Sequence, residues 1–471
     1  MTTETATSER AGLRLLPYHF FDLQGVTHIV NVNRKYSRPA EGPLVAALRD
    51  RGPVEAAELT EEVFEQVKRL GLIDKGGPVK PQPEVKEPPV QRISLFAAQV
   101  CNLSCGYCYG IGGEYGKKGL LKEDVAFQSV DWLIAKSLDA KEVSISFFGG
   151  EPMINFPVMQ RVVEYAKEKA AQAGKKIQFL VTTNATLLDD EKIAYLKQEQ
   201  FSVTVSFDGP AEVQDRNRPF RNGTGSSHAV AKANIEKLLA AIPSALCRST
   251  VVGDTDPADV TRGVREVGFK NYSLTEASGV ALPGQVKPHT PPSRDKFMRF
   301  YEEELAQILA AVKARDLEKI IDLKNSAVIG ALVKNRKGKQ QHFCGAGRSY
   351  LAVSATGDVY PCHRFVGMEN YKIGTVYQKP IQQEEFTRSA ADSNPTCSAC
   401  WAKYYCGGGC YYDHTATNGS LSLPNADECD LIRHRIKLAI HLASQLERAD
   451  FQWLEEHRII PKLPWYLDLL Q

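Results

Sequence analysis

The chain has 471 residues and a mass of 52.1 kDa, enough for two to four domains at about 100–200 residues each. With 58 Lys and Arg against 56 Asp and Glu, its formal net charge is +2, which argues against a protein whose main task is to grip nucleic acid or an anionic membrane. No run of 18 apolar residues is present, and the first ten residues lack the basic and apolar regions of a secretory signal. We therefore expect a cytoplasmic protein, in which the 11 cysteines are metal ligands or catalytic groups rather than disulfides.

The beginning of the chain is predicted to form a small winged-helix-like domain over residues 13–75. Two strand-like runs, 15–22 and 27–32, precede two helix-like segments, 43–51 and 60–70. Thr60 followed by two glutamates is a good helix start. Residues 76–90 are rich in proline, which is typical of an extended, semi-rigid linker.

Residues 91–290 alternate between strand-like and helix-like segments. The predicted strands are 92–98, 143–148, 178–183, 202–207, 246–252 and 271–276, and the predicted helices between them are 122–138, 157–173, 189–198, 227–241 and 257–267. This alternation predicts the α/β class, with a parallel sheet rolled into a partial (β/α)6 TIM-like barrel. In such barrels the chemistry lies at the C-terminal ends of the strands.

The remaining chain is predicted to contain three further parts. A helical bridge covers 291–340, with helices over 293–316 and 322–337. A loop-rich, cysteine-dense domain covers 341–435, and a helical tail over 436–471 continues a helix predicted for 432–445 and ends near Trp465 and Tyr466.

Three cysteines follow the first barrel strand at the spacing C-x3-C-x2-C: Cys101, Cys105 and Cys108. Three thiolates close together hold three irons of a [4Fe–4S] cube and leave the fourth iron without a protein ligand. The alternative is a zinc site, but zinc takes four ligands and typically uses paired C-x2-C units. The spacing therefore favours the iron–sulfur interpretation.

These features resemble the radical S-adenosylmethionine (radical SAM) superfamily, whose loop carries an aromatic residue where Tyr107 stands. Further family-like motifs follow successive strands, at Gly149-Gly150-Glu151, at Asn184, and at Ser206 and Asp208. The resemblance implies that the three cysteines bind the cluster, that SAM chelates its free iron, and that the strand-end motifs contact SAM. Alone, a Gly-Gly-Glu sequence is more often an ordinary turn, and the motif of Ser206 and Asp208 could be a plain strand exit; the order of the motifs along the chain carries the prediction.

Three residues near these motifs have a plainer interpretation as well. Arg218 and Arg248 either neutralise the SAM carboxylate or are ordinary surface and strand arginines, and we favour the ordinary role because neither lies in a diagnostic motif. Cys247 lies inside a predicted strand and is expected to be a buried core thiol.

The C-terminal cysteines resemble the seven-cysteine pattern of SPASM domains. This resemblance implies an auxiliary cluster I on Cys344, Cys362 and Cys410, and an auxiliary cluster II on Cys397, Cys400, Cys406 and Cys429. A zinc ribbon explains the Cys397–Cys400 pair alone but leaves the glycine-rich turn before Cys410 unexplained. Seven cysteines leave one iron without a cysteine ligand, and Gly338 stands where sulfatase maturases carry an additional cysteine. His342 and His363 flank these cysteines as possible ligands, although a hydrogen-bonding role is more common.

Together these resemblances imply a radical SAM/SPASM peptide maturase with three [4Fe–4S] clusters and SAM as cofactors. The segments 397–410 and 361–365 look most like thioether-forming enzymes, such as the maturases of six-cysteine peptides and of the quinohemoprotein amine dehydrogenase γ subunit. The alternatives are carbon–carbon crosslinking, epimerisation, or sulfatase formylglycine formation; outside enzymes, the alternative is a zinc-binding structural module.

The same resemblance implies the partners: a peptide or small-protein substrate with a leader segment, and a reductant such as flavodoxin or ferredoxin, with no nucleic acid and no membrane. The N-terminal domain is expected to bind the leader as an added strand at an exposed edge, for which 27–32 is the candidate, or else to be a structural cap. The catalytic base stays unknown, since Asp358 and Glu276 are more readily structural.

Overall fold

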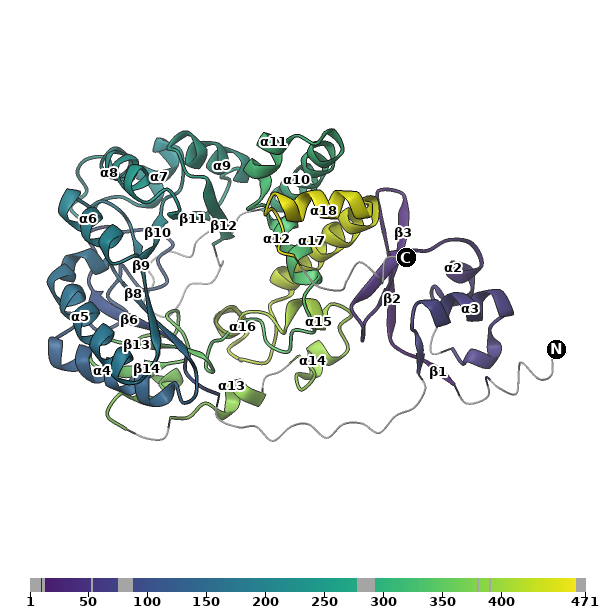
Figure 1. Ribbon diagram of the computed structural model, residues 1–471, viewed down its shortest axis with the longest axis horizontal. Coiled ribbons are helices and arrows are strands. Elements are labelled where there is room, and N and C mark those ends of the chain that lie inside the picture. The colour runs from purple at the N-terminus through teal and green to yellow at the C-terminus, as the bar shows by residue number, and fades with distance from the viewer. Residues whose placement is uncertain are drawn as a thin grey trace.

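The computed structural model describes residues 10, 13–51, 54–74, 88–277, 293–378, 381–388 and 391–462. Residues 76–87 of the predicted linker lie outside the described residues, and so do residues 463–471 of the predicted tail. The barrel stands at one end of the molecule, a bundle of helices and a loop-rich region lie in the middle, and the N-terminal unit lies at the other end (Figure 1). None of the described helices is long and apolar enough to cross a membrane.

Six parallel strands form the barrel sheet in the order β12-β11-β10-β9-β8-β6. They are β6 (Arg92–Gln99), β8 (Glu142–Gly149), β9 (Lys176–Thr183), β10 (Ser202–Ser206), β11 (Leu246–Val251) and β12 (Asn271–Glu276). The connecting helices are α4 (Glu123–Lys136), α5 (Phe156–Gln172), α6 (Asp190–Gln198), α7 (Ala211–Asn217), α8 (Ser227–Ala241) and α9 (Pro257–Glu266). Every predicted barrel strand is confirmed within two residues, as are the five predicted helices; the short α7 was not predicted.

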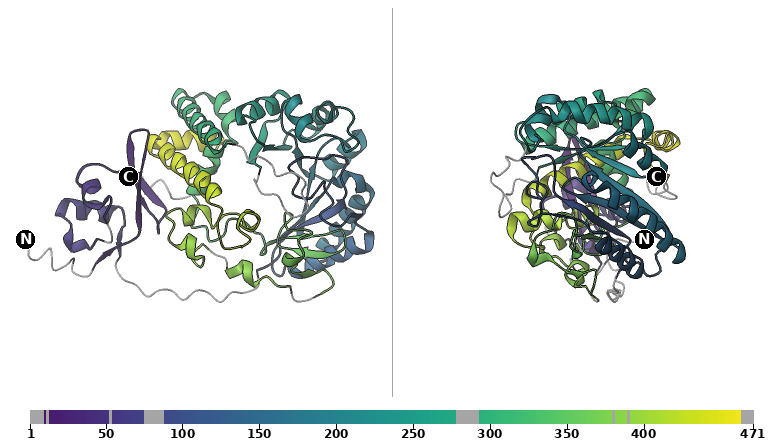
Figure 2. Two further views of the ribbon diagram at one scale, coloured as in Figure 1. Left: turned by 180° about the vertical axis from the view of Figure 1, so that it is seen from behind. Right: turned by 90° about the vertical axis from the view of Figure 1, so that its left-hand side faces the viewer.

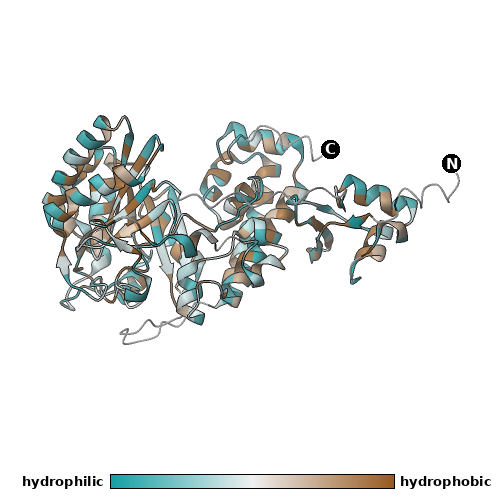
Figure 3. Ribbon diagram, turned by 90° about the horizontal axis from the view of Figure 1, so that it is seen from below, coloured by the Kyte–Doolittle hydropathy of each residue, from teal (hydrophilic) through white to brown (hydrophobic). Residues whose placement is uncertain are grey.

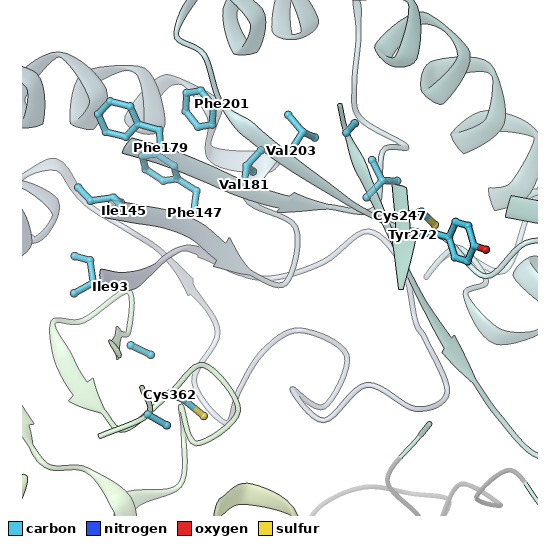
Figure 4. Packing of buried hydrophobic residues seen from close by; sticks show 14 of the residues in the cluster. Ile93, Ile145, Phe147, Phe179, Val181, Phe201, Val203, Cys247, Tyr272 and Cys362 are labelled. Atoms are coloured by element: carbon cyan, nitrogen blue, oxygen red, sulfur yellow. The ribbon is translucent and has the colours of Figure 1, made fainter. Parts of the chain in front are cut away.

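The two faces of the barrel strands differ in chemistry. In β10, Val203 and Val205 are buried while Ser202, Thr204 and Ser206 alternate with them on the other face. The buried residues of neighbouring strands join this core beneath the helices, as the sticks of Ile145, Phe147, Phe179 and Val181 show (Figure 4). The helices carry their apolar sides toward the sheet and their polar sides outward (Figure 3). The inner face of β10 is consequently more polar than its face beneath the helices.

The barrel sheet continues beyond β6 into the cysteine-rich region. Strand β13 (Tyr350–Val353) pairs parallel to β6, and β14 (Asp358–Tyr360) and β15 (Gly374–Thr375) follow antiparallel. The short β7 (Gly119–Leu120) pairs with the end of β6. The barrel and the cysteine-rich region therefore share one sheet, which the sequence did not predict.

The helical bridge contains α10 (Arg294–Ala314), α11 (Leu317–Leu323) and α12 (Ala327–Asn335). The predicted single helix over 322–337 is wrong, because the chain turns before Ser326, whose side chain caps α12 by accepting from the Ile329 amide. Among the described residues, the rest of the chain holds four short helices, α13 (Glu384–Arg388), α14 (Pro395–Ser398), α15 (Lys403–Cys406) and α16 (Tyr411–Asn418), and then the longer α17 (Ala426–Gln445) and α18 (Arg448–Glu456) in the tail. Helix α17 begins before the predicted 432, so the predicted boundary between 435 and 436 falls inside a helix.

The N-terminal unit has a hydrophobic core of its own and lies at the far end of the molecule from the barrel (Figure 2). Its elements are β1 (Arg14–Leu15), β2 (Tyr18–Leu23), β3 (Val26–Asn31), β4 (Tyr36–Pro39), α2 (Gly42–Leu48), the 3-10 turn η1 (Ala56–Glu58), α3 (Glu61–Arg69) and β5 (Ile73–Asp74). The candidate edge strand over 27–32 is wrong: β3 is the middle strand of the β2-β3-β4 sheet, and β2 and β4 are its outer strands.

One face of this small sheet packs on the cysteine-rich region and on α17. Phe21 and Val30 share a buried cluster with Tyr405, Ile436 and Ile440. The docking also includes polar contacts, described below for Lys35 and for the pair His28 and His441. The N-terminal unit is thus fixed to the same region that carries the C-terminal cysteines.

Candidate functional site

The first cysteine loop lies directly after β6. Two backbone hydrogen bonds join it to the end of α7 and to the residues that follow that helix. The amides of Ser104 and Gly106 donate to the carbonyls of Pro219 and Asn217, at 2.8 and 3.0 Å. The Asn184 side chain, at the end of β9, donates to the Asn102 side chain at 2.9 Å and to Cys101 Sγ at 3.8 Å. The loop is therefore fixed from the end of β9 and from the segment at the end of α7.

The three thiols of this loop lie within one another's electrostatic reach. Burial first, and then the Glu151 carboxylate, raise the pKa of Cys101 to about 12, with Cys108 adding to the effect. Burial raises the pKa of Cys105 as well, with Cys108 and Cys101 among the contributing neighbours. Since thiolates are the ligands of iron, binding a cluster here releases protons.

Gly149 and Gly150 let β8 pass close against the end of β6. The Gly150 and Glu151 amides donate to the carbonyls of Ala98 and Val100 at 2.7 and 2.9 Å. A Cβ on either glycine would collide with the same carbonyl oxygens. Packing thus requires the two glycines. Glu151 follows them directly and therefore lies at the end of β8.

Glu151 is fully buried and accepts three hydrogen bonds. The donors are the Thr183 hydroxyl at 2.8 Å, the Asn184 amide at 2.7 Å and the Met153 amide at 3.1 Å. Burial outweighs these donors and raises the pKa of Glu151 to about 7. Within the described part of the chain Glu151 has no ion pair, so its carboxylate is suited to a cationic ligand group.

Asp208, at the end of β10, is the centre of a second buried network. Its carboxylate accepts from Arg218 at 3.0 and 3.1 Å, from the Tyr107 hydroxyl at 2.6 Å and from the Thr250 amide at 2.9 Å. The Arg218 guanidinium also lies 5.1 Å from the centre of the Tyr107 ring. Arg218 is only 7% exposed, so it is not a surface arginine, whereas Arg248 is exposed on its strand and Cys247 is a buried core thiol as expected. Ser206 is half-buried beside this network.

The C-terminal cysteines gather in two groups. Burial first, and then Cys429 and Cys400, raise the pKa of Cys397 to about 11. Cys429 is also among the neighbours that help burial raise the pKa of Cys406 to about 12. These four cysteines therefore lie together, beside the face where the N-terminal unit docks.

The second group consists of Cys344, Cys362 and Cys410. Burial is the main cause that raises the pKa of Cys362 to about 12, and Cys344 contributes. Arg364 Nη1 lies 3.7 Å from Cys410 Sγ and forms an ion pair with Asp413 at 2.9 Å. The same guanidinium lies 5.5 Å from the centre of the Tyr109 ring in the first cysteine loop. The sequence analysis did not identify Arg364 as a link between the two cysteine regions. Its one signal in the sequence is its position two residues after Cys362.

The other candidate residues have structural partners. His363 Nδ1 lies 2.6 Å from the Tyr350 hydroxyl, and His342 Nδ1 lies 3.5 Å from the Tyr411 hydroxyl. Glu276 accepts from the Tyr301 hydroxyl at 2.8 Å, and Asp358 is paired with Lys372. A structural role for Glu276 and Asp358 agrees with these contacts.

A site for a single metal ion and a site for a four-iron cluster require different arrangements of the ligand side chains. Among the described residues, no three Cys, His, Asp or Glu side chains converge as ligands of a single ion. A four-iron cube takes one thiolate per iron around a larger volume. Gly407 to Gly409 have φ of +80°, +101° and +79°, and a Cβ on Gly407 would lie 2.5 Å from the His342 carbonyl. The thiols of the three groups are the kind of ligand that such clusters take, and the glycine turn belongs to the segment between Cys406 and Cys410.

Two family models match the chain in the same order as these sites. The radical SAM superfamily model matches residues 97–261, and the SPASM iron–sulfur cluster-binding domain matches residues 344–401. The chain therefore contains a radical SAM domain followed by a SPASM domain.

Relatives and solved structures extend this similarity. An uncharacterised protein of Methanocaldococcus jannaschii is 34% identical, in a match that covers 29% of this chain and 45% of that protein. The radical SAM cyclopropyl synthase TigE of Paramaledivibacter caminithermalis is 30% identical, in a match that covers 26% of this chain and 28% of TigE. The chain thus spans less than half the length of these two relatives. A cysteine-type anaerobic sulfatase-maturating enzyme of Clostridium perfringens is 24% identical over 69% of this chain and 89% of its own. The solved structure of native anSMEcpe with bound AdoMet and Cp18Cys peptide shares the fold, with a TM-score of 0.60 and 18% identity over 79% of this chain and all of that chain.

Proposed function

We propose that this protein is a radical SAM/SPASM enzyme that modifies a peptide or small protein, forming thioether crosslinks between a cysteine sulfur and a carbon of another residue. The observation that supports this most is the convergence of the Cys101–Cys108 loop, Glu151, Asn184 and Asp208 at the C-terminal ends of adjacent parallel strands. In barrels of this kind, that end of the sheet holds the chemistry.

In this proposal Cys101, Cys105 and Cys108 hold the first cluster and SAM lies against the strand ends. A cluster held by these cysteines and reduced by one electron from an external donor would supply the cleavage of SAM into methionine and a 5′-deoxyadenosyl radical, which would remove an unactivated hydrogen from the substrate. Glu151 receives the SAM ammonium, because its buried carboxylate has hydrogen-bond donors but, among the described residues, no cationic partner. The Asp208–Arg218 pair holds Tyr107 and with it the cysteine loop.

The SPASM cysteines are assigned to two auxiliary clusters. Cys397, Cys400, Cys406 and Cys429 hold auxiliary cluster II, and Cys344, Cys362 and Cys410 hold auxiliary cluster I. The second set is one ligand short of four, which leaves one position for a substrate thiolate, and soft thiolates suit iron–sulfur sites. That vacancy is what favours a thioether product.

The N-terminal domain, residues 13–75, is proposed to bind the leader segment of the substrate as an added strand. The leader strand would pair with one of the outer strands, β2 or β4, and not with residues 27–32, which lie in the middle strand. Pro39 cannot donate at the end of β4, so a strand added there pairs best before that residue.

The test is anaerobic incubation with SAM, a chemical reductant and cysteine-containing peptides encoded beside the protein. A thioether product has lost two hydrogens and one alkylatable thiol, because one S–H and one C–H become one C–S bond. One hydrogen atom would leave with the 5′-deoxyadenosyl radical, the other hydrogen would leave as a proton, and the remaining electron would pass to an oxidised cluster. The Cys101→Ala variant is the matched control. An unchanged peptide mass together with inverted stereocentres would assign epimerisation and overturn the proposal.

Formylglycine formation is the second candidate, because sulfatase-maturating enzymes are among the relatives that match most of their own length. Its product carries an aldehyde that reacts with a hydrazide, and a thioether does not. Gly338 counts against this alternative, since sulfatase maturases carry a cysteine at that position by the resemblance described above.

A further inference from the structure

A basic pocket opens on the outside of the molecule beside the first cysteine loop. It has a volume of about 430 Å³ and lies between the β6–β7 pairing, the start of α4 and the turn between β13 and β14. Three exposed lysines line it, Lys117, Lys118 and Lys122, against one carboxylate, Asp124. In a chain with a net charge of only +2, this local excess of positive charge is a distinct feature.

The wall of this pocket is close to the first cluster site. Gln99 lines the pocket, is 2% exposed, and precedes Cys101 by two residues. Two residues of extended chain span at most about 7 Å. The Gln99 side chain also donates to the Glu114 and Lys117 carbonyls at 3.2 and 2.9 Å and accepts from the Ala355 amide at 2.8 Å, which fixes the lysine-bearing segment to both domains.

Apolar side chains stand beside the lysines. Leu120 is 46% exposed and Tyr377 is 59% exposed, both unusually high for residues of their size. A Cβ on Gly357 would lie 3.1 Å from the Tyr377 ring and 3.4 Å from Val125, which lines the pocket, so Tyr377 borders the same place. Leu120 and Tyr377 therefore add apolar contact area beside the lysines.

We infer that this basic pocket, formed around Lys117, Lys118 and Lys122, is the docking surface for a small acidic one-electron carrier protein of the flavodoxin type. Positive charge steers an acidic partner into contact, and the short path from Gln99 to Cys101 brings its electron next to the first cluster. In each transfer the reduced carrier is oxidised by one electron and the cluster held by Cys101, Cys105 and Cys108 is reduced by one. The electron transfer in this inference rests on the proposed radical SAM function, whereas the binding of the carrier protein can be tested without it.

The experiment compares two reductants with the reconstituted full-length protein. The variant K117E/K118E reverses two charges of the pocket, and the control K197E/K232E reverses two exposed lysines on α6 and α8. Formation of 5′-deoxyadenosine is measured with reduced flavodoxin and, separately, with dithionite, a small reductant that needs no docking surface. We expect K117E/K118E to need at least about ten times more flavodoxin at low salt, with unchanged activity under dithionite, and the difference to shrink in about 0.5 M salt as charges are screened.

Direct binding of flavodoxin, measured by biolayer interferometry, separates this inference from the proposed function. If the wild-type protein forms no 5′-deoxyadenosine even with dithionite, the proposed function fails, and a tenfold weaker binding of flavodoxin to K117E/K118E would still support the docking surface. Equal flavodoxin binding by K117E/K118E and K197E/K232E would overturn the inference. Equal losses of activity with both reductants would also overturn it, because they would indicate damage to the site rather than to docking.

Discussion

Arg218 and Asp208 form a buried two-point ion pair at the end of β10, with Nε–Oδ2 and Nη2–Oδ1 distances of 3.0 and 3.1 Å. Because Asp208 also accepts from the Tyr107 hydroxyl, the pair connects the fourth barrel strand to the loop that carries the first three cysteines. The cluster loop is therefore positioned by a buried charge network as well as by the fold.

Removing Arg218 leaves the Asp208 carboxylate buried and without its cation. We expect Arg218→Met to lower the free energy of unfolding by about 3–5 kcal/mol, measured by chemical denaturation under anaerobic conditions. Arg161→Met is the matched control, because Arg161 forms its ion pairs at the surface, where such pairs contribute about 1 kcal/mol or less. Equal effects of the two substitutions would contradict the role assigned to the buried pair.

Glu151 predicts a pH dependence of stability in protein without SAM. Its pKa rises from an ordinary 4.5 to about 7 on folding, so the folded state binds the proton more tightly. This contribution is complete below about pH 4.5 and is lost as the pH rises through about 7, by roughly 3 kcal/mol. Unfolding measured from pH 5.5 to 8 should therefore show a steeper fall for the wild type than for Glu151→Gln, and saturating SAM should reduce that fall. Parallel profiles would show that this carboxyl keeps its ordinary pKa.

Lys35 fastens the N-terminal unit to the helical bridge. Its ammonium donates to the carbonyls of Lys334, Lys337 and Gly338, at 3.2, 2.9 and 3.3 Å, at the end of α12. Lys35→Met keeps the aliphatic stem and removes these bonds, so we expect docking to weaken by about 1.5–3 kcal/mol. Limited proteolysis should then cut faster between the N-terminal unit and the barrel, whereas the exposed Lys68→Met should behave like the wild type.

The buried pair His28 and His441 makes the same docking sensitive to acid. Their ring nitrogens lie 3.1 Å apart, and burial first, followed by the neighbouring histidine, lowers the pKa of His28 from 6.5 to about 4, although Asp22 opposes the shift. A depressed histidine pKa means that docking is strongest above about pH 6.5 and weakens as the pH falls toward 4.

Hydrogen exchange over residues 18–31, corrected for its intrinsic pH dependence, measures this effect. Exchange should increase at pH 5 in the wild type, and the increase should be smaller in H28L/H441L. Nearby His19, whose pKa burial also lowers to about 4 beside Lys437 and Arg433, leaves some pH dependence in that variant. Exchange that is unchanged between pH 7.5 and 5 in the wild type would exclude the histidine pair as the cause.

The barrel strands and the cysteine groups were predictable because local patterns determine them. Buried and polar residues alternate along β10, and cysteine spacings are short-range features. The edge strand and the partner of Asp208 were not predictable, because both depend on pairing between segments far apart in the chain. The break before Ser326 was missed since the apolar pattern continues across it, and only the serine cap marks the new helix.

We propose that the chain holds three four-iron clusters and cleaves SAM with one of them. The most direct measurement is the iron, sulfide and zinc content of protein purified without oxygen, together with 5′-deoxyadenosine formation by the same sample. We expect about twelve irons per chain and SAM cleavage that Cys101→Ala abolishes while about eight irons remain. Zinc without iron, or a fully iron-loaded protein that leaves SAM intact, would contradict it.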